Sequence, residues 1–318
     1  MRKSIVLLLV IVILGITLSA CGTNSVGPVK EADTAETVVA KADLKIMDDA
    51  VVSYLGPEGT YTEEATLTFF DDAKSLIPET TVDDAIENVE NGSSDYAVIP
   101  QENTLGGAVT NYVDALISHD DLSVVGEVIL PINQTLMGVP GARLEDIHTV
   151  CSHSQGLTQS EEWRKENLPN AETNEMKSTA AAAKYVAESG DKTLAAIAAY
   201  GAAELYGLSV LAENVQITDT NKTRFYVLSR TSLKTELQTN AVLVASCEAN
   251  RIDDIIVDLH NAGLELVTIH DRPEGSKLGM YNYIIEVKNG SGITEKMKAA
   301  IDSIADIQYR GSFAVIEK

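Results

Sequence analysis

The chain is poor in cysteine, aromatic residues and positive charge. Its 318 residues include three cysteines and five scattered histidines, and only 5% are aromatic. This excludes a fold held by many disulfides, and no Cys or His cluster has metal-ligand spacing, so we expect no metal site. Cys151 and Cys247 fall in what we interpret as different domains, which favours two separate buried thiols. A hydrophobic content of 45% still supports a folded core.

Positive charge is scarce enough to exclude whole classes of partner. The chain has 24 Lys and Arg against 47 Asp and Glu, a net charge of −23. Nucleic-acid binding requires basic patches, so no nucleic-acid partner is expected. Binding to anionic lipid through surface charge is disfavoured in the same way. A small anionic substrate would need local positive groups or oriented donors.

The N-terminus reads as an export signal. Arg2 and Lys3 precede an apolar run over 5–18 that is short for a membrane span, and Leu18-Ser19-Ala20-Cys21 follows. A cysteine after small residues resembles the lipobox of bacterial lipoproteins. That resemblance implies a signal peptide over 1–20, cleavage before Cys21 and a lipid on its thiol; the alternative is an uncleaved anchor. Both place the body outside the cytoplasm, anchored to a membrane, with 21–49 as a flexible tether.

From residue 50 to 232, short apolar runs alternate with amphipathic runs. Strands are expected near 50–56, 95–100, 122–132, 148–153, 193–198 and 208–214, with helices between them, including one over 154–167. This order predicts an α/β domain of sheets flanked by helices. The pattern divides near 120 and near 200, which predicts two lobes, the second over about 121–200, with a cleft between them.

The pattern changes after residue 235. Strands over 241–248, 264–273, 280–289 and 309–318 and helices over 252–263 and 293–305 give the order βαββαβ. This order is typical of a small ferredoxin-like domain over 238–318. The pattern alone indicates a regulatory or dimerising module.

Polar residues gather where strands pass into helices. Glu102, Asn103 and Thr104 follow one strand, Ser152 and Gln155 follow another, and Ser178-Thr179 opens an Ala-rich helix. Each group alone reads as a simple N-cap. Their recurrence at one kind of position favours an anion site at the carboxyl ends of strands. In NKTRF (221–225), Thr223 and Arg224 begin a strand. They are either surface residues at the edge of a buried strand or a proton donor and an anion ligand.

Six segments carry a family resemblance: YLGPEGTYTEEA (54–65), YAVIPQENTLGGAV (96–109), SHSQGLTQ (152–159), STAAAAKYVAE (178–188), AAELYGLSVLAENVQ (202–216) and NKTRF. In order and spacing they resemble prephenate dehydratase. GLELVTIHDRPEGSKLGMYNYIIEV (263–287) is similar to the ACT domain that follows in that family. The resemblance covers nearly everything outside the signal and tether. It implies a two-lobed, periplasmic-binding-protein-like domain followed by a ferredoxin-like ACT domain.

The resemblance also implies the activity. Prephenate would lose its ring hydroxyl and CO2 together and become phenylpyruvate, in phenylalanine biosynthesis and without a cofactor. Hydroxide is a poor leaving group, so a donor is needed as the C–O bond breaks. Thr223 is implied as the essential hydroxyl, and Arg224 as an anion ligand or as the residue that holds the strand end. The other implied pocket residues are Glu102, Asn103, Thr104, Ser152, Gln155, Gln159, Ser178 and Thr179.

Several positions depart from the family pattern. Ser154 replaces the usual Pro, Ser160 a frequent Cys, and Asn133-Gln134 stands where a His is common. These changes leave arogenate open as a related substrate. The family's Glu-Ser-Arg-Pro is His270-Asp271-Arg272-Pro273 here, and Asn250-Arg251-Ile252 replaces its Gly-Ala-Leu. The C-terminal domain would therefore bind a phenylalanine effector or serve only to form a homodimer or higher homo-oligomer.

A second function class stays open on sequence grounds. Solute-binding proteins of importers also place a two-lobed α/β cleft on a lipid tether. The same cleft would then bind or sense an aromatic or carboxylate ligand without turnover. Retention of Thr223 favours the enzyme, because a binding protein has no particular need for that hydroxyl.

Overall fold

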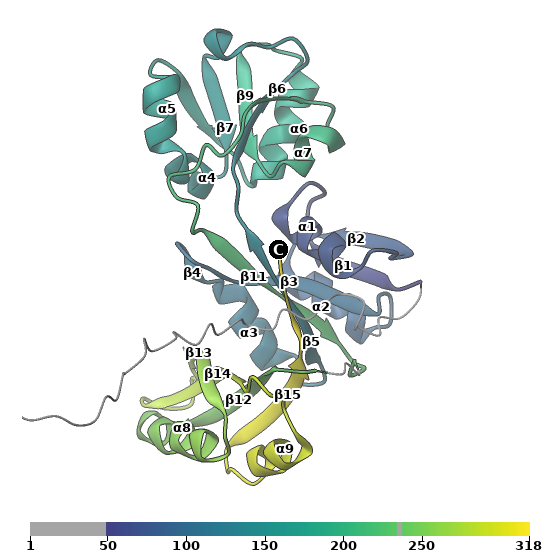
Figure 1. The fold of residues 1–318 in the computed structure, drawn as a ribbon, viewed down its shortest axis with the longest axis vertical. Helices are drawn as coiled ribbons and strands as arrows, with labels where there is room; N and C mark the ends of the chain where they lie inside the picture. Colours follow the sequence, from purple (N-terminus) through teal and green to yellow (C-terminus); the bar gives the residue numbers. More distant parts are fainter. Residues whose placement is uncertain (1–48, 234–236) are drawn as a thin grey trace, which may run out of the picture. The chain divides into compact units, whose positions relative to one another are not determined.

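The computed structural model describes residues 49–233 and 237–318, which form three β-sheets with flanking helices (Figure 1). The fold is α/β with mixed sheets, as the alternating pattern predicts. The expected signal peptide (1–20), the lipidation site Cys21 and nearly all of the tether (21–49) lie outside the described residues. Within 49–233 and 237–318, no helix is long and apolar enough to cross a membrane. Cys151 and Cys247 are buried and unbonded, as expected.

The first sheet has seven strands in the order β16-β5-β11-β3-β1-β2, with β4 paired to β3. β1 is parallel to β2 and β3, whereas β11 is antiparallel to both of its neighbours. Helix α1 covers one face of the sheet and packs in the same core as Phe225 and Val227 of β11. Helices α2 and α3 cover the other face and pack in the same core as Tyr226 and Leu228. The elements are β1 (Val51–Leu55), α1 (Tyr61–Phe69), β2 (Ser75–Glu79), α2 (Val82–Glu90), β3 (Tyr96–Asn103), β4 (Gly107–Ala108), α3 (Thr110–Ser118), β5 (Ser123–Pro131), β11 (Lys222–Ser229) and β16 (Val315–Glu317).

The second sheet has five strands in the order β10-β6-β9-β7-β8. Ala182 and Ala183 of α6 pack on Ala196 and Ala198 of β9, and these small side chains let helix and sheet approach closely. Trp163 and Leu157 pack on the opposite face. The elements are β6 (Thr135–Gly138), β7 (Thr149–Ser152), α4 (Ser154–Gln159), α5 (Glu161–Asn167), β8 (Glu172–Glu175), α6 (Thr179–Ser189), β9 (Leu194–Ala198), α7 (Gly201–Leu205) and β10 (Ser209–Ala212).

The third sheet is antiparallel, with four strands in the order β13-β14-β12-β15. Its two helices cover one face. Val242 and Ile284 on the other face join the same core cluster as Tyr112 and Ile99, so this sheet packs against α3 and the seven-stranded sheet (Figure 1). The elements are β12 (Asn240–Glu248), α8 (Ile252–Asn261), β13 (Glu265–Pro273), β14 (Met280–Lys288), α9 (Glu295–Asp302) and β15 (Ile307–Phe313).

Three boundaries differ from the sequence predictions. The expected helix over 154–167 is two helices, because Ser160 leaves the helical conformation and its hydroxyl donates to the Gly156 carbonyl, 2.7 Å away. The expected strand over 309–318 is also two. β15 stays in the four-stranded sheet and β16 pairs in parallel with β5 of the seven-stranded sheet. The five-stranded sheet spans 135–212 rather than about 121–200, because β5 pairs with β11.

Candidate active site

The candidate site begins where β11 pairs with β3. Thr223 lies opposite Asn103 in the antiparallel ladder, so the two side chains share one face of the sheet. The Asn103 amide nitrogen donates to the Thr223 hydroxyl over 2.9 Å and to Asn221 Oδ1 over 2.8 Å. Thr223 is only 8% exposed. Within the described residues, its hydroxyl proton has no acceptor, so it remains available to a ligand.

The orientation of the Asn103 amide follows from its other contacts. Its oxygen accepts from the backbone N–H groups of Leu105 (3.1 Å) and Gly106 (2.9 Å). Both partners are donors, so the oxygen must face them and the amide nitrogen must face Thr223. A hydroxyl that already accepts a hydrogen bond is a better donor through its own proton. Asn103 therefore prepares Thr223 to donate.

A residue from a helix beside the five-stranded sheet also reaches this group. Gln155, in the first turn of α4, donates its amide to Asn103 Oδ1 over 3.2 Å. Gly106 makes room for it, since a Cβ there would lie 3.0 Å from Gln155 Nε2. Thr223, Asn103 and Gln155, three of the predicted pocket residues, are thus brought together. Thr104 lies beside them and exchanges hydrogen bonds with the backbone of Lys222, which holds the start of β11.

The remaining predicted residues of the five-stranded sheet have structural partners of their own. Ser152 donates to the Ile197 carbonyl over 2.7 Å, and Ser178 caps α6 by accepting from Ala181 N. Ser152 and Thr179 both pack against Gly156, where a Cβ would clash with the Ser152 hydroxyl. Gln159 accepts from the Gln134 amide over 3.1 Å. The structure gives these residues no direct contact with Thr223.

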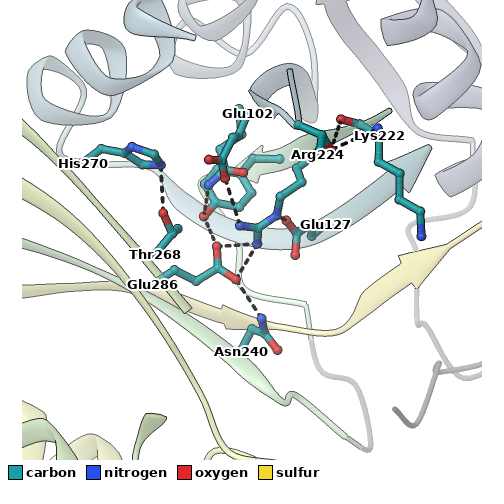
Figure 2. Close-up of polar contacts among 11 residues, drawn as sticks. Glu102, Glu127, Lys222, Arg224, Asn240, Thr268, His270 and Glu286 are labelled. Carbon is teal, nitrogen blue, oxygen red and sulfur yellow. Dashed lines mark hydrogen bonds and ion pairs between the residues drawn. The ribbon is translucent and has the colours of Figure 1, made fainter. Parts of the chain in front are cut away.

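Arg224 and Glu102 lie on the opposite face of the sheet from Thr223, because side chains alternate along a strand. Figure 2 shows Arg224 among the carboxylates of Glu102, Glu127 and Glu286. Arg224 Nε donates to Glu127 Oε1 over 2.5 Å, and Nη2 reaches both oxygens of Glu286 at 2.7 Å. Glu102 lies 3.6 Å from Arg224 Nη1. Of the two roles expected for Arg224, this geometry favours holding the strand. It brings neither Arg224 nor Glu102 to the Thr223 hydroxyl.

The charges of this buried group do not balance if every residue is ionised. Arg224 supplies one positive charge, while Glu127 and Glu286 are both fully buried. Burial, and then the negative charge of Glu286, raise the pKa of Glu127 to about 8 against the pull of Arg224. One Glu127 oxygen also lacks a hydrogen-bond partner. Burial therefore favours the protonated form of Glu127 beside the Arg224–Glu286 pair.

Sequence reasoning missed Glu127, Glu286 and Asn221, and it named Gln134 only as a departure from the family pattern. A signal existed for the two glutamates, since each is a lone charge inside an apolar strand, SVVGEVILP and MYNYIIEVK. Gln134 and Asn221 are buried amides in the segments that join the two larger sheets. Gln134 Oε1 and Asn221 Nδ2 are each buried without a partner. Unpaired polar atoms of this kind are rare in folded proteins and mark this neighbourhood as a place where a ligand could supply the missing bonds.

The predicted effector residues lie in β13. His270 contacts Thr268 Oγ1 at 3.1 Å and meets the Tyr112 ring edge-on. Arg272 forms a two-bond ion pair with Asp114 of α3, at 2.6 and 2.9 Å. Asp271 and Pro273 are exposed. Among residues 49–233 and 237–318, no group of three or more His, Cys, Asp or Glu is arranged to hold a metal ion.

Comparisons with known proteins show which family the chain resembles. The sequence model of the prephenate dehydratase family matches residues 52–233. A bifunctional chorismate mutase/prephenate dehydratase of Neisseria gonorrhoeae is 33% identical over 291 residues, which cover 90% of this chain and 79% of the relative. The chloroplastic arogenate dehydratase 5 of Arabidopsis thaliana is 34% identical over 228 residues, covering 70% of this chain and 53% of the relative. A prephenate dehydratase of Arthrobacter aurescens, solved in complex with L-Phe, superposes with a TM-score of 0.72 at 31% identity, covering 83% of this chain and 90% of that chain.

Proposed function

The chain belongs to the prephenate dehydratase family, and we propose that Thr223 carries the decarboxylating dehydration of prephenate to phenylpyruvate. The observation that supports this role most is the Asn103–Thr223 hydrogen bond, which leaves the hydroxyl proton free to be donated. In the reaction, prephenate dianion takes up one proton and yields phenylpyruvate, CO2 and water. Departure of CO2 pushes electrons into the ring while the C–O bond breaks, and ring aromaticity drives the step.

Each residue of the site has a different chemical role in this proposal. The Thr223 hydroxyl donates to the departing oxygen, and Asn103 fixes and polarises that hydroxyl. A Thr hydroxyl is a weak acid in water, but donors aimed at developing charge are far more effective in a site that excludes water. Gln155, Ser152, Gln159, Thr104 and Thr179 would line the pocket, and Ser178 lies at the N-terminus of α6, whose free N–H groups suit a carboxylate. Arg224 and Glu102 belong to the supporting layer behind the strand.

Substrate choice and regulation are proposals at the same level. The Arabidopsis relative is named an arogenate dehydratase, so arogenate is the second substrate to test. We infer that residues 50–232 form a two-lobed dehydratase domain and that 238–318 form an ACT domain. The Arthrobacter structure was solved in complex with L-Phe, which supports a phenylalanine effector that acts here through His270–Pro273. If phenylalanine has no effect on the rate of this protein, the domain has a purely dimerising role.

Location is also a proposal. Residues 1–21 have the pattern of a lipoprotein signal, so we propose an extracytoplasmic protein anchored through Cys21. The expected result is incorporation of labelled palmitate that Cys21→Ser abolishes. Equal labelling of both proteins would overturn the anchor.

The experiment that tests the function compares purified full-length protein with its Thr223→Ala variant. Prephenate is supplied at neutral pH and phenylpyruvate is followed by its absorbance in alkali. We expect turnover by the parent and a loss of at least about a hundredfold in Thr223→Ala, with an unchanged thermal unfolding transition. A folded parent that turns over neither prephenate nor arogenate would contradict the proposal. If that parent still bound prephenate, it would be the solute-binding alternative.

A further inference from the structure

Glu286 is a buried carboxylate of the four-stranded sheet that accepts hydrogen bonds from a strand of the seven-stranded sheet as well as from its own sheet. It lies in β14, and both of its oxygens accept from Arg224 Nη2 of β11 at 2.7 Å (Figure 2). Tyr226, also in β11, donates to Glu286 Oε2 over 2.5 Å, and Asn240 of β12 donates to Oε1 over 2.7 Å. Donors from three residues thus satisfy both oxygens of a carboxyl group that is removed from water.

This carboxylate binds the strand that carries Thr223. Arg224 and Tyr226 share one face of β11, and Thr223 and Phe225 share the other. The ladder between β11 and β3 is irregular at this point, since Arg224 lies opposite Glu102 whereas Phe225 lies opposite Pro100. Gln101 is the extra residue of this bulge, and its amide donates to the Tyr226 hydroxyl over 3.1 Å. A bulge redirects neighbouring side chains, so whatever holds it sets the direction of Thr223 and Asn103.

The other groups around Arg224 cannot replace Glu286. Glu127 of β5 accepts only from Arg224 Nε and through one oxygen, and burial raises its pKa to about 8. Glu102 of β3 lies at 3.6 Å and is partly exposed. The rings of Tyr112 in α3 and His270 in β13 pack beside the cluster without a hydrogen bond to Arg224. Glu286 is thus the one described residue that grips the guanidinium with two short bonds while accepting from Tyr226.

We propose that Glu286 is a positioning residue for the reaction at Thr223, acting through Arg224 and Tyr226. The inference rests on the proposed function and deepens it, because it makes the geometry of the catalytic strand depend on a residue of the C-terminal sheet. A shift of β14 would reach Thr223 through two side chains. The C-terminal sheet would then influence turnover more than binding, since Glu286 lies on the far face of the sheet from the Thr223 hydroxyl.

The first test is Glu286→Gln in the full-length protein. The variant keeps the shape and removes the charge that holds Arg224. We expect kcat for prephenate to fall about tenfold or more while KM stays within about twofold, because misalignment of a reacting group costs rate. Glu248→Gln is the matched control, since Glu248 is an exposed glutamate of the same sheet that pairs with Lys277 at 2.6 Å. It should leave kcat and KM unchanged.

A double variant separates positioning from stability. Arg224→Met with Glu286→Leu, made in a Glu127→Gln background because Arg224 also bonds Glu127, removes both members of the ion pair, and replacing both partners of a buried pair with apolar residues often preserves stability. If Glu286 only stabilises the fold, the double variant recovers kcat along with its unfolding temperature, and the proposal is overturned. We expect the unfolding temperature to recover while kcat stays at least about tenfold low. The double variant decides alone if Glu286→Gln is unfolded at the assay temperature.

The controls also distinguish the two proposals. No turnover by the folded parent contradicts the proposed function. Turnover by the parent with an equal kcat in folded Glu286→Gln contradicts the positioning role and leaves the function intact. A fall in kcat for Glu248→Gln equal to that for Glu286→Gln would also overturn it, since the effect would then be general to charge loss in this sheet.

Discussion

At the residue scale, the proposed role of Thr223 depends on which end of the Asn103 side chain faces it. Asn103→Asp keeps the size and the acceptor for Leu105 N and Gly106 N, but it presents a second acceptor to the Thr223 hydroxyl. Thr223 would then donate to the carboxylate instead of to the substrate. We expect kcat for prephenate to fall by about a hundredfold, in line with loss of one aligned donor, with a smaller change in KM. Steady-state kinetics with phenylpyruvate detection measures both.

The matched control for this change is Asn91→Asp. Asn91 is exposed, and its side-chain oxygen accepts from Ser93 N over 2.9 Å, which an aspartate also does. It should therefore behave like the parent. If Asn103→Asp retained the parent kcat, the donation from Asn103 to Thr223 would have no catalytic part.

Alternation within a strand made some residue placements predictable and left their partners hidden. Two neighbours in a strand face opposite ways, so Thr223 and Arg224 could be assigned to different faces from NKTRF alone. The sequence could not show what Arg224 contacts on its own face of the strand. Its partner Glu286 lies 62 positions further along the chain, in a second sheet. The ordered family segments were needed to connect Asn103, Gln155 and Thr223.

At the element scale, helix α6 tests whether Ser178 is more than a cap. Its hydroxyl accepts from Ala181 N over 3.0 Å, which an aspartate at the same position also does. Ser178→Asp should thus keep the unfolding temperature within about 2 °C, because a carboxylate at a helix N-terminus is a good cap. If Ser178 lines a pocket for a dianion, the added charge raises KM for prephenate by about tenfold or more. Thermal unfolding and the kinetic assay give the two readouts.

Thr294→Asp is the control for that helix. Thr294 caps α9 in the same way, accepting from Met297 N over 3.2 Å, far along the chain from the candidate site. It should change neither KM nor kcat. An unchanged KM in Ser178→Asp would remove Ser178 from the pocket and leave it as a cap alone.

Element type was easier to predict than element ends, for identifiable physical reasons. Amphipathic and apolar periodicity located most helices and strands. Ser160 ended α4 through a side-chain bond to the Gly156 carbonyl, which no periodicity reports. The last strand split because the chain passes from one sheet to another after Phe313. Gly311 permits that path, with φ of +117° and no room for a Cβ beside the Val124 carbonyl.

At the scale of the whole molecule, the last segment and one ion-pair cluster join the seven-stranded and four-stranded sheets. β16 pairs with β5 next to Glu127, and Glu286 reaches Arg224 from the four-stranded sheet. Arg310 is almost fully buried and donates to the backbone carbonyls of Leu116, Leu122 and His119. In the Arg224–Glu286 pair, removing one side chain would leave the other buried without its partner. The C-terminal sheet is thus bound to the sheet that carries Thr223 by charge as well as by apolar packing.

This cluster makes the stability of the protein depend on pH. Folding raises the pKa of Glu127 from an ordinary 4.5 to about 8, so the folded state holds a proton that the unfolded chain releases. The associated stability is fully present below pH 4.5 and is lost as pH rises through about 8, by up to about 1.4 kcal/mol per pH unit.

Glu127→Gln mimics the protonated form of Glu127. The unfolding free energy of this variant should therefore fall less than that of the parent between pH 6 and pH 8, by roughly 2 kcal/mol at most. Urea unfolding at several pH values measures this, with Glu162→Gln on the exposed face of α5 as the control that keeps the parent slope. Parallel pH profiles for the parent and Glu127→Gln would mean that Glu127 is ionised in the folded protein, and the charge count around Arg224 would have to be revised.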